Sequence, residues 1–478
     1  MKTMNKILFL ASITALSCLT ACSVNGADDD IYLDIDPNAI RPNGDKDSDP
    51  DIFNPTTLAD SEFVYNYNSL DIYYLNHDEV GDIFEYYNRT KEGTVADIYY
   101  MYSKMSDPMT NYYDPTIGNY IMTSLIYSDA NIGIGAQVES FRISDSDSAL
   151  VFTQVYPKGP AEKAGIRKGD TVLTVRGTKP ANAESFDVLA SGNVGQTVKI
   201  EVKRDEKKSF EVILNEFLTP SVFLDSIENI PVIRITEFAN ITPSDSGSYG
   251  EFVNALNKTQ GAKSTIIDLR GNGGGIIDQC VNIASELLGK GDTIISYVQA
   301  EYDSIRDAQR IDTLTYEAIE KGIGADRYYV ILADSNSASC SETMISAITV
   351  NKKSPVVGLL SYGKGCGQYY LPTYAGGVSV VTAIMAYDKN WKSFHKVGIE
   401  PDFVEKDKAT ATAKAVELAK SMTVTRTKGY GTKDLGRFDP KPSYKSNSLN
   451  KKAASTPTWE YGQAAVIKDF QGIHAKRK

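Results

Sequence analysis

The sequence has little histidine, little cysteine and one short apolar run. Its 478 residues include three histidines and five cysteines. The histidines (His77, His395 and His474) are far apart and have no ligand-like spacing. This pattern disfavours a histidine-rich metal site and an ordinary Ser–His–Asp enzyme. The cysteines are too few for a disulfide scaffold. We therefore expect neither a metal nor any other cofactor.

Positive charge is also in short supply. Lys and Arg number 50 against 61 Asp and Glu, which gives a net charge of −11. A protein whose main task is to bind nucleic acid is disfavoured by this balance, so we expect no nucleic-acid partner. Hydrophobic residues make up 42% of the chain, enough for buried cores. The length suggests roughly three folded units.

The first residues have the pattern of an export signal. Lys2 and Lys6 precede the apolar stretch 7–19, which is too short to span a bilayer comfortably. It leads into Leu-Thr-Ala-Cys ending at Cys22, which resembles the lipobox of bacterial lipoproteins. We predict a lipoprotein signal peptide at 1–21 and lipidation of Cys22. The protein would then be anchored in the cell envelope, on the periplasmic side or the cell surface.

The two ends of the remaining chain carry opposite charge. From Ser23 to Asp60 there are ten Asp and two basic residues, a net charge of −8. Such a segment cannot bury enough apolar surface to fold, so we predict an acidic tether at 22–60. From Ser421 to Lys478 there are twelve basic and four acidic residues, net +8. We predict a C-terminal helix and basic tail at 407–478, with the tail flexible or loosely docked.

The middle of the chain divides into three blocks. Helix-like spacing of large apolar residues predicts a helical N-terminal domain at 61–130. Alternating apolar residues and Gly-Pro and Gly-Asp turns predict a small β domain at 131–216. Alternating strands and helices predict an α/β domain with a partly parallel sheet at 217–406. Its predicted strands are 232–235, 265–269, 329–332 and 378–381, and its predicted helices are 276–288 and 341–350.

Three motifs of the third block carry chemistry. The run Asp268–Gly275 is a Gly-rich loop between a strand and a helix, but it lacks the third glycine of a dinucleotide fingerprint. Its backbone amides suit either an oxyanion or a phosphate. The run Gly358–Gly365 approaches a P-loop but lacks the final hydroxyl residue, so a nucleotide site is disfavoured. The run Asp334–Glu342 is rich in serine and opens a helix; alone it fits either a nucleophile corner or a simple helix cap.

Together these motifs resemble the C-terminal processing peptidases, also called tail-specific proteases. Ser-Ala-Ser-Cys-Ser-Glu at 337–342 is similar to the family's nucleophile run, and Gly-Lys-Gly follows with Lys364 25 positions after Ser339. Asp-Pro-Met-Thr at 107–110 matches a further signature of the family. The resemblance covers about 61–405. It implies an α/β protease domain with a ClpP/crotonase-like fold and an inserted PDZ domain.

The second block itself resembles a PDZ domain. The resemblance rests on Gly-Pro-Ala-Glu-Lys-Ala-Gly-Ile-Arg-Lys-Gly-Asp at 159–170 and on the loop Gly133, Ile134 and Gly135. The resemblance implies that this loop binds a terminal carboxylate and that a peptide adds as a strand to a sheet edge. The expected partners are proteins or peptides with exposed C-terminal tails.

The resemblance implies a Ser–Lys serine endopeptidase. Ser339 would be the nucleophile, Lys364 the general base and Gln368 the supporting residue. An ordinary lysine has a pKa of about 10.4, so the site must lower it by burial before the amine can accept a proton. Backbone amides of Gly273, Gly274 and Cys340 would form the oxyanion hole.

Two cysteines depart from the family pattern. Cys340 stands where alanine is usual, and Cys366 follows Lys364 by two residues. A nucleophile at Cys340 would lack a histidine partner. We expect two small buried thiols here rather than a Cys340–Cys366 disulfide. The alternative function is a catalytically silent, PDZ-type peptide-binding lipoprotein on a protease-like fold.

Overall fold

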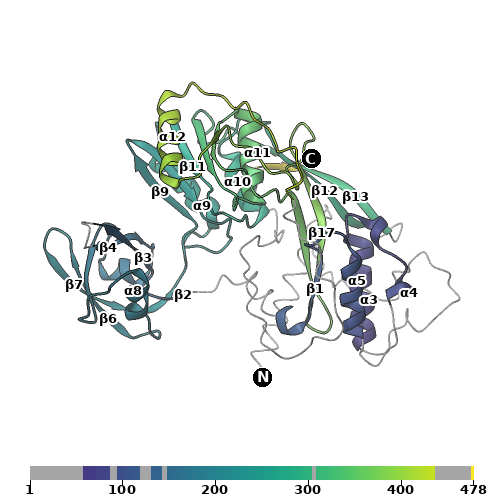
Figure 1. Cartoon of the computed structure of the whole chain (residues 1–478), viewed down its shortest axis with the longest axis horizontal. Coiled ribbons are helices and arrows are strands. Elements are labelled where there is room, and N and C mark those ends of the chain that lie inside the picture. Colours follow the sequence, from purple (N-terminus) through teal and green to yellow (C-terminus); the bar gives the residue numbers. More distant parts are fainter. Residues whose placement is uncertain are drawn as a thin grey trace. The chain divides into compact units, whose positions relative to one another are not determined.

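The computed structural model describes most of the chain between residues 58 and 435 (Figure 1). The described ranges are 58–86, 94–118, 131–142, 148–303, 308–435 and 475–477. The predicted signal peptide, Cys22 and nearly all of the acidic tether lie outside these ranges. The chain forms two units, the second made of residues 127–221 and 239–251 and the first of the remainder.

A mainly parallel sheet forms the centre of the first unit, as the sequence predicts. Its order is β18-β15-β14-β11-β10-β9, and only β9 runs antiparallel to its neighbour. Every residue of β11 is buried, including the polar Ser264, Thr265 and Asp268, because the strand lies inside a sheet covered on both faces. The strands are β9 (Val222–Ile227), β10 (Ile230–Ile235), β11 (Ser264–Asp268), β14 (Tyr328–Ala333), β15 (Val356–Gly358) and β18 (Phe403–Val404).

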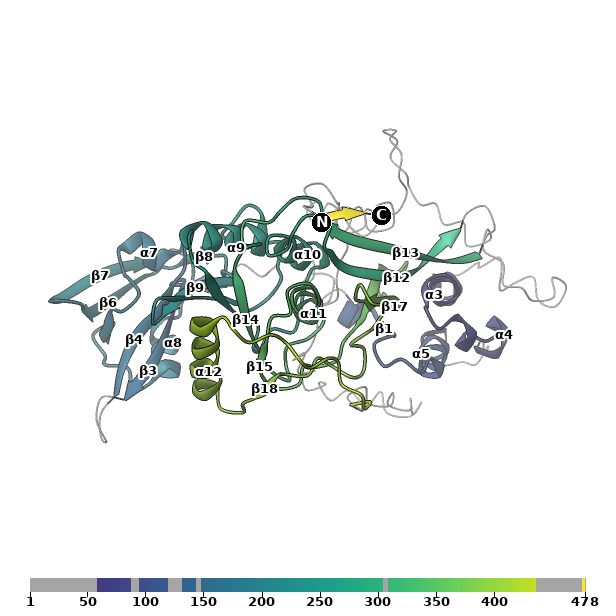
Figure 2. The same cartoon turned by 90° about the horizontal axis from the view of Figure 1, so that it is seen from above.

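Helices cover this sheet. They are α9 (Gly247–Lys258), α10 (Ile277–Ser285), α11 (Cys340–Lys352) and α12 (Lys408–Ser421). α12 packs its alanine-rich face, including Ala411 and Ala415, on apolar residues of β10, β11, β14 and β15. α11 has an unbroken run of buried residues from Cys340 to Thr349. A helix without an exposed face must be covered by other elements on every side. Figure 2 shows α11 between the two sheets of this unit.

A second, antiparallel sheet completes the first unit. Its strands are β1 (Asn111–Tyr113), β12 (Thr293–Asp303), β13 (Ala308–Ala318), β16 (Cys366–Pro372), β17 (Val378–Tyr387) and β19 (Ala475–Arg477). The predicted strand 378–381 belongs here and not to the parallel sheet. The reason is the tight turn between β16 and β17, in which Thr373 donates its amide to the carbonyl of Gly377.

The N-terminal helices pack on this second sheet. They are α3 (Leu58–Tyr73), the 3-10 helix η1 (His77–Glu79), α4 (Ile83–Tyr86) and α5 (Thr94–Lys104). Their core includes Leu371 of β16 and Val381 of β17. The buried carboxylate of Glu62 accepts from the hydroxyl of Tyr112 at 2.8 Å and from the amide of Ala375 at 2.9 Å. The predicted helices are therefore present, and they share one core with the antiparallel sheet.

The second unit is the small β domain that the sequence predicts. A five-stranded antiparallel sheet runs in the order β3-β4-β5-β6-β7, and β2 pairs with β8. Asp170 is buried and receives two hydrogen bonds from the guanidinium of Arg204, at 2.6 and 2.7 Å. The elements are β2 (Asn131–Gly133), β3 (Ala136–Arg142), β4 (Ser148–Val155), α7 (Pro160–Ala164), β5 (Thr171–Val175), α8 (Ala183–Ala190), β6 (Thr197–Lys203), β7 (Lys207–Ile213) and β8 (Asn215–Phe217).

The first part of the basic tail is docked rather than flexible. Arg426 donates to Asp402 at 3.0 Å, and the amides of Thr427 and Lys428 bind the other oxygen of that carboxylate. Tyr430 donates its hydroxyl to Asp388 at 2.9 Å. The prediction of a loosely held tail is therefore wrong for this segment; residues 436–474 lie outside the described ranges. No helix among the described residues is long and apolar enough to cross a bilayer.

Candidate active site

Ser339 sits at a strained corner between a strand and a helix. β14 ends at Ala333, and Ser339 is the N-cap residue of α11 with φ 56° and ψ −117°. A non-glycine residue with positive φ is uncommon and costs energy that the surrounding structure must supply. Ser339 is half-buried, whereas Ala338 and Cys340 on either side are buried. The corner therefore presents one serine at the positive end of a helix.

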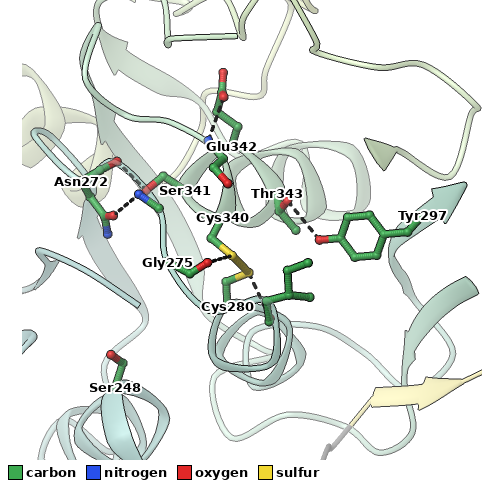
Figure 3. Close-up of a disulfide and its surroundings, with 12 residues drawn as sticks. Ser248, Asn272, Gly275, Cys280, Tyr297, Cys340, Ser341, Glu342 and Thr343 are labelled. Carbon is green, nitrogen blue, oxygen red and sulfur yellow. Dashed lines mark hydrogen bonds between the residues drawn. A yellow bond between two sulfur atoms is a disulfide. The ribbon is translucent and has the colours of Figure 1, made fainter. Parts of the chain in front are cut away.

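The Gly-rich loop after β11 lies directly against this corner. A Cβ atom on Gly274 would stand 2.8 Å from the Cβ of Ser339 and 3.2 Å from the amide nitrogen of Cys340. The carbonyl of Asn272 accepts from the amide of Ala338 at 3.0 Å and from the hydroxyl of Ser341 at 2.9 Å (Figure 3). A side chain at position 274 would push these two segments apart, so glycine is required there.

The loop offers fewer oxyanion donors than the sequence suggests. The amide of Gly274 donates to Oδ1 of Asn272 at 2.8 Å. The structure thus differs from the prediction at Gly274, because the buried Asn272 side chain occupies that amide to hold the turn. Gly273 and Cys340 are then the candidate donors to an oxyanion.

The buried carboxylate of Glu342 connects the corner at Ser339 with the lysine loop, residues 361–364. Oε2 of Glu342 accepts from the amide of Ser339 at 3.0 Å and from the amide of Lys364 at 2.7 Å. Oε1 accepts from the hydroxyl of Ser361 at 2.5 Å and the amide of Gly363 at 2.6 Å. Burial raises the pKa of Glu342 to about 7, against the effect of these hydrogen bonds, which favour the ionised form. In the sequence Glu342 is only the last residue of the serine-rich run that opens the helix, so its contact with the Gly363–Lys364 backbone was missed.

Lys364 lies in the surroundings that a neutral amine needs. Only 3% of its surface is exposed. Burial lowers the pKa of Lys364, and electrostatic interactions with Cys366, Asp107 and Glu342 oppose that effect. The lysine loop is fixed on its other side, where the carbonyl of Gly363 accepts from the amide of Lys396 at 2.7 Å.

Gln368 lies on β16, where it is buried. Its Nε2 donates to Oγ1 of Thr382 at 3.1 Å and to Sγ of Cys366 at 3.3 Å. Neither of these two bonds reaches the amine of Lys364, for which Gln368 is the predicted supporting residue. The amide of Thr382 donates to Oγ1 of Thr110 at 2.9 Å, and that hydroxyl donates to Asp107 at 2.8 Å. The Asp-Pro-Met-Thr segment therefore connects to Gln368 through Thr382, a residue that sequence reasoning missed.

The cysteines are arranged differently from the prediction. Cys340 forms a disulfide with Cys280 of α10, with a Cα–Cα distance of 5.7 Å, and both residues are buried (Figure 3). The expectation of two buried thiols is wrong for Cys340, because the partner comes from the helix that follows the Gly-rich loop. Cys366 is a free, buried thiol, and burial raises its pKa to about 11.

In the second unit, the predicted carboxylate loop leads into a sheet edge. Gly133 ends β2, Ile134 is buried in the domain core, and Gly135 has φ 68° just before β3. Carbonyls of the loop are anchored, since Ile134 accepts from Ala161 at 2.7 Å and Gly135 from Tyr156 at 2.9 Å. β3 is the edge strand of its sheet, and α8 packs beside it. This is the arrangement to which an extended peptide can add as a strand.

Comparison with known proteins separates the chain into the same two parts, a peptidase domain and a PDZ domain. Residues 229–405 match the peptidase family S41, and residues 132–214 match the PDZ domain family. The chain carries a domain of peptidase family S41. It is a serine-type peptidase that carries a PDZ domain.

Two curated relatives of this S41 peptidase are proteases by name. The chain is 26% identical to the carboxy-terminal processing protease CtpA of Bacillus subtilis over 397 residues, 81% of this chain and 78% of that protein. It is 27% identical to a probable CtpA-like serine protease of Staphylococcus haemolyticus over 328 residues, 66% of this chain and 61% of that protein. A solved structure described as a putative S41 protease from Bacteroides fragilis has a TM-score of 0.49 at 14% identity, covering 75% of this chain and 98% of that chain. The match to the S41 family and the two curated relatives do not favour the alternative of a catalytically silent binding protein.

Proposed function

We propose that this S41 peptidase cleaves envelope proteins or peptides that expose a free C-terminal tail. Ser339 is the nucleophile, Lys364 the general base, and Gln368 a supporting residue. The observation that carries the proposal is the Glu342 carboxylate, one oxygen of which binds the amides of both Ser339 and Lys364. The burial of Lys364, which lowers its pKa, supports the role of base.

The chemistry follows from these positions. Ser339 Oγ attacks the peptide carbonyl carbon while its proton passes to the neutral Nζ of Lys364. The charge that develops on the carbonyl oxygen is met by the amides of Gly273 and Cys340. Lys364 then returns the proton to the leaving amine, which releases one product and leaves an ester on Ser339. Water attacks the ester by the same route, which releases the acyl part as the second product with a new C-terminal carboxyl group and regenerates the serine.

The PDZ domain would capture the substrate tail. The terminal carboxylate binds at the loop Gly133, Ile134 and Gly135, and the tail extends along β3 as an added strand. A disulfide between Cys280 and Cys340 is the kind of bond that persists in an oxidising compartment. That supports export, and with the lipobox-like sequence at Cys22 it supports a lipid-anchored envelope protein.

Digestion of an unstructured protein with an apolar free C-terminus tests the proposal. Wild type should cleave it, whereas Ser339→Ala and Lys364→Ala should lose most of the activity, on the order of 10³-fold or more. Equal cleavage by all three proteins would refute the mechanism. Cleavage of the same substrate with an amidated C-terminus should be slower, because the carboxylate loop then lacks its ligand.

A further inference from the structure

The Cys280–Cys340 disulfide joins α11, whose first amide is a proposed oxyanion donor, to α10, the helix that follows the loop of the other donor, Gly273. Cys280 lies in α10, the helix that begins directly after the Gly-rich loop. Cys340 is the first residue of α11 and follows Ser339. In Figure 3 the bond bridges these two helices beside Gly275. The chain segments that must meet at the oxyanion are therefore linked covalently as well as by packing.

We propose that this disulfide is a positioning device, holding the amide of Cys340 against the Gly-rich loop so that hydrolysis is faster with the bond formed. The inference rests on the proposed function, because it requires Ser339 to be the nucleophile. Cys280 and Cys340 are then positioning residues, since their side chains act through the backbone of the oxyanion hole and do not touch the substrate.

The geometry around Cys340 shows why one more restraint matters. Asn272 binds Ala338 and Ser341, so hydrogen bonds hold the corner from the side of the Gly-rich loop. The disulfide holds the same corner from the side of α10. An oxyanion donor must be placed within about 0.5 Å of its productive position to be effective. The positive φ of Ser339 adds strain that favours relaxation of the corner when a restraint is removed.

Reduction would release this restraint without leaving unsatisfied polar groups. A dithiol breaks the Sγ–Sγ bond by supplying two electrons and two protons, and it becomes a disulfide itself. Sγ of Cys280 lies 3.2 Å from the carbonyl oxygen of Ile277, and Sγ of Cys340 lies 3.4 Å from that of Gly275. Each new thiol would find an acceptor in place. We therefore expect the reduced protein to stay folded and to lose rate.

The test compares the full-length wild type with Cys280→Ala, with and without dithiothreitol. Ile283→Val is the matched control, because Ile283 is a buried residue of the same helix and its change leaves the disulfide intact. Peptide mapping with iodoacetamide should label Cys280 and Cys340 only after reduction. Loss of one whole oxyanion donor costs about 10²–10³ in kcat, so displacement of one should cost roughly tenfold. KM should stay within about twofold.

Three results are expected together. Wild type and Ile283→Val should lose kcat on reduction, Cys280→Ala should start low and not respond, and thermal unfolding should show all proteins folded at the assay temperature. Reduced wild type serves as the second arm if Cys280→Ala does not fold. Labelling of both cysteines without reductant, or kcat unaffected by both reduction and Cys280→Ala, would overturn the inference. If Ser339→Ala cleaves as fast as wild type, the inference fails together with the proposed function. If cleavage requires Ser339 but does not change on reduction or in Cys280→Ala, only the inference fails.

Discussion

Ser339 and Lys364 donate their backbone amides to the same oxygen atom, Oε2 of Glu342, at 3.0 and 2.7 Å. These residues are 25 positions apart and lie on different loops. A shared acceptor restricts the separation of the two backbones. The relationship makes Glu342 the structural link between the proposed nucleophile and the proposed base.

Glu342→Gln should therefore impair both activity and stability. The glutamine side chain would turn an NH₂ group towards donors that now bind a carboxylate oxygen. A buried donor left without an acceptor costs about 1–3 kcal/mol. We expect a loss of kcat of roughly 100-fold and a lower free energy of unfolding, measured by peptide cleavage and urea unfolding. Ser361→Ala, which removes one donor and leaves the carboxylate, is the milder control. A Glu342→Gln enzyme with wild-type kcat would contradict this role.

The pH dependence of the reaction should reflect a lysine with a lowered pKa. Burial lowers the pKa of Lys364 from its ordinary value of 10.5. The amine accepts a proton only when neutral, so kcat/KM should rise with pH through an ionisation below that value. The measurement is a pH–rate profile on a short peptide that has no other titrating group in the range. A profile that rises only above pH 10 would argue against the buried base.

Lys364→Met should make the protein inactive but more stable. In the unfolded chain the lysine stays charged up to about pH 10.4, whereas burial disfavours the charge in the folded state. The cost of the lysine is therefore full below its folded pKa and disappears as the pH rises towards its unfolded value. Removing it should add roughly 1–3 kcal/mol at pH 6 and less at pH 10, by urea unfolding. The exposed Lys258→Met serves as the control and should show no such trend. A variant destabilised equally at both values would contradict the account.

Thr382→Val tests the connection from the Asp-Pro-Met-Thr segment to Gln368. Valine keeps the backbone amide that binds Thr110 but removes the hydroxyl that accepts from Gln368. One lost hydrogen bond is worth about 1 kcal/mol, so kcat should fall roughly fivefold with little change in KM. Thr382→Ser retains the hydroxyl and should recover most of the rate. If both variants behave alike, the hydroxyl does not position Gln368.

Gly135→Val should weaken capture of the substrate tail. Gly135 has φ 68°, and a Cβ there would stand 3.1 Å from Cδ of Pro160, so valine would distort the carboxylate loop. We expect KM for a free-tailed substrate to rise roughly tenfold, while an amidated substrate is cleaved at the wild-type rate. Both are measured by steady-state kinetics. An equal loss on the two substrates would mean that the loop does not read the carboxylate.

Patterns along the chain predict local elements well. β11, β14, α10 and α11 lie close to the predicted strands and helices, and β14 shows the continuous apolar run that burial on both faces leaves in a sequence. The sequence predicts the strand at 378–381 but not its place in a second, antiparallel sheet. Strand propensity says nothing about the partner strand, and here a tight turn after β16 decides it.

Contacts between distant positions could not be predicted in this way. Cys280 and Cys340 are 60 residues apart, and neither lies in a motif that pairs them. Thr110 and Thr382 are 272 positions apart. Such contacts depend on how helices and sheets pack, and the local spacing of apolar residues in one sequence does not show this packing. The proposed catalytic residues were found only because their spacing resembles a known family.

Covalent labelling of the proposed nucleophile tests the central claim most directly. The enzyme is incubated with a fluorophosphonate, and mass spectrometry of its peptides locates the adduct. We predict one adduct on Ser339, formed faster as the pH rises through the ionisation of Lys364 and lost in Lys364→Met. An adduct on another residue, or labelling of Ser339 that is unchanged in Lys364→Met, would contradict the Ser–Lys mechanism.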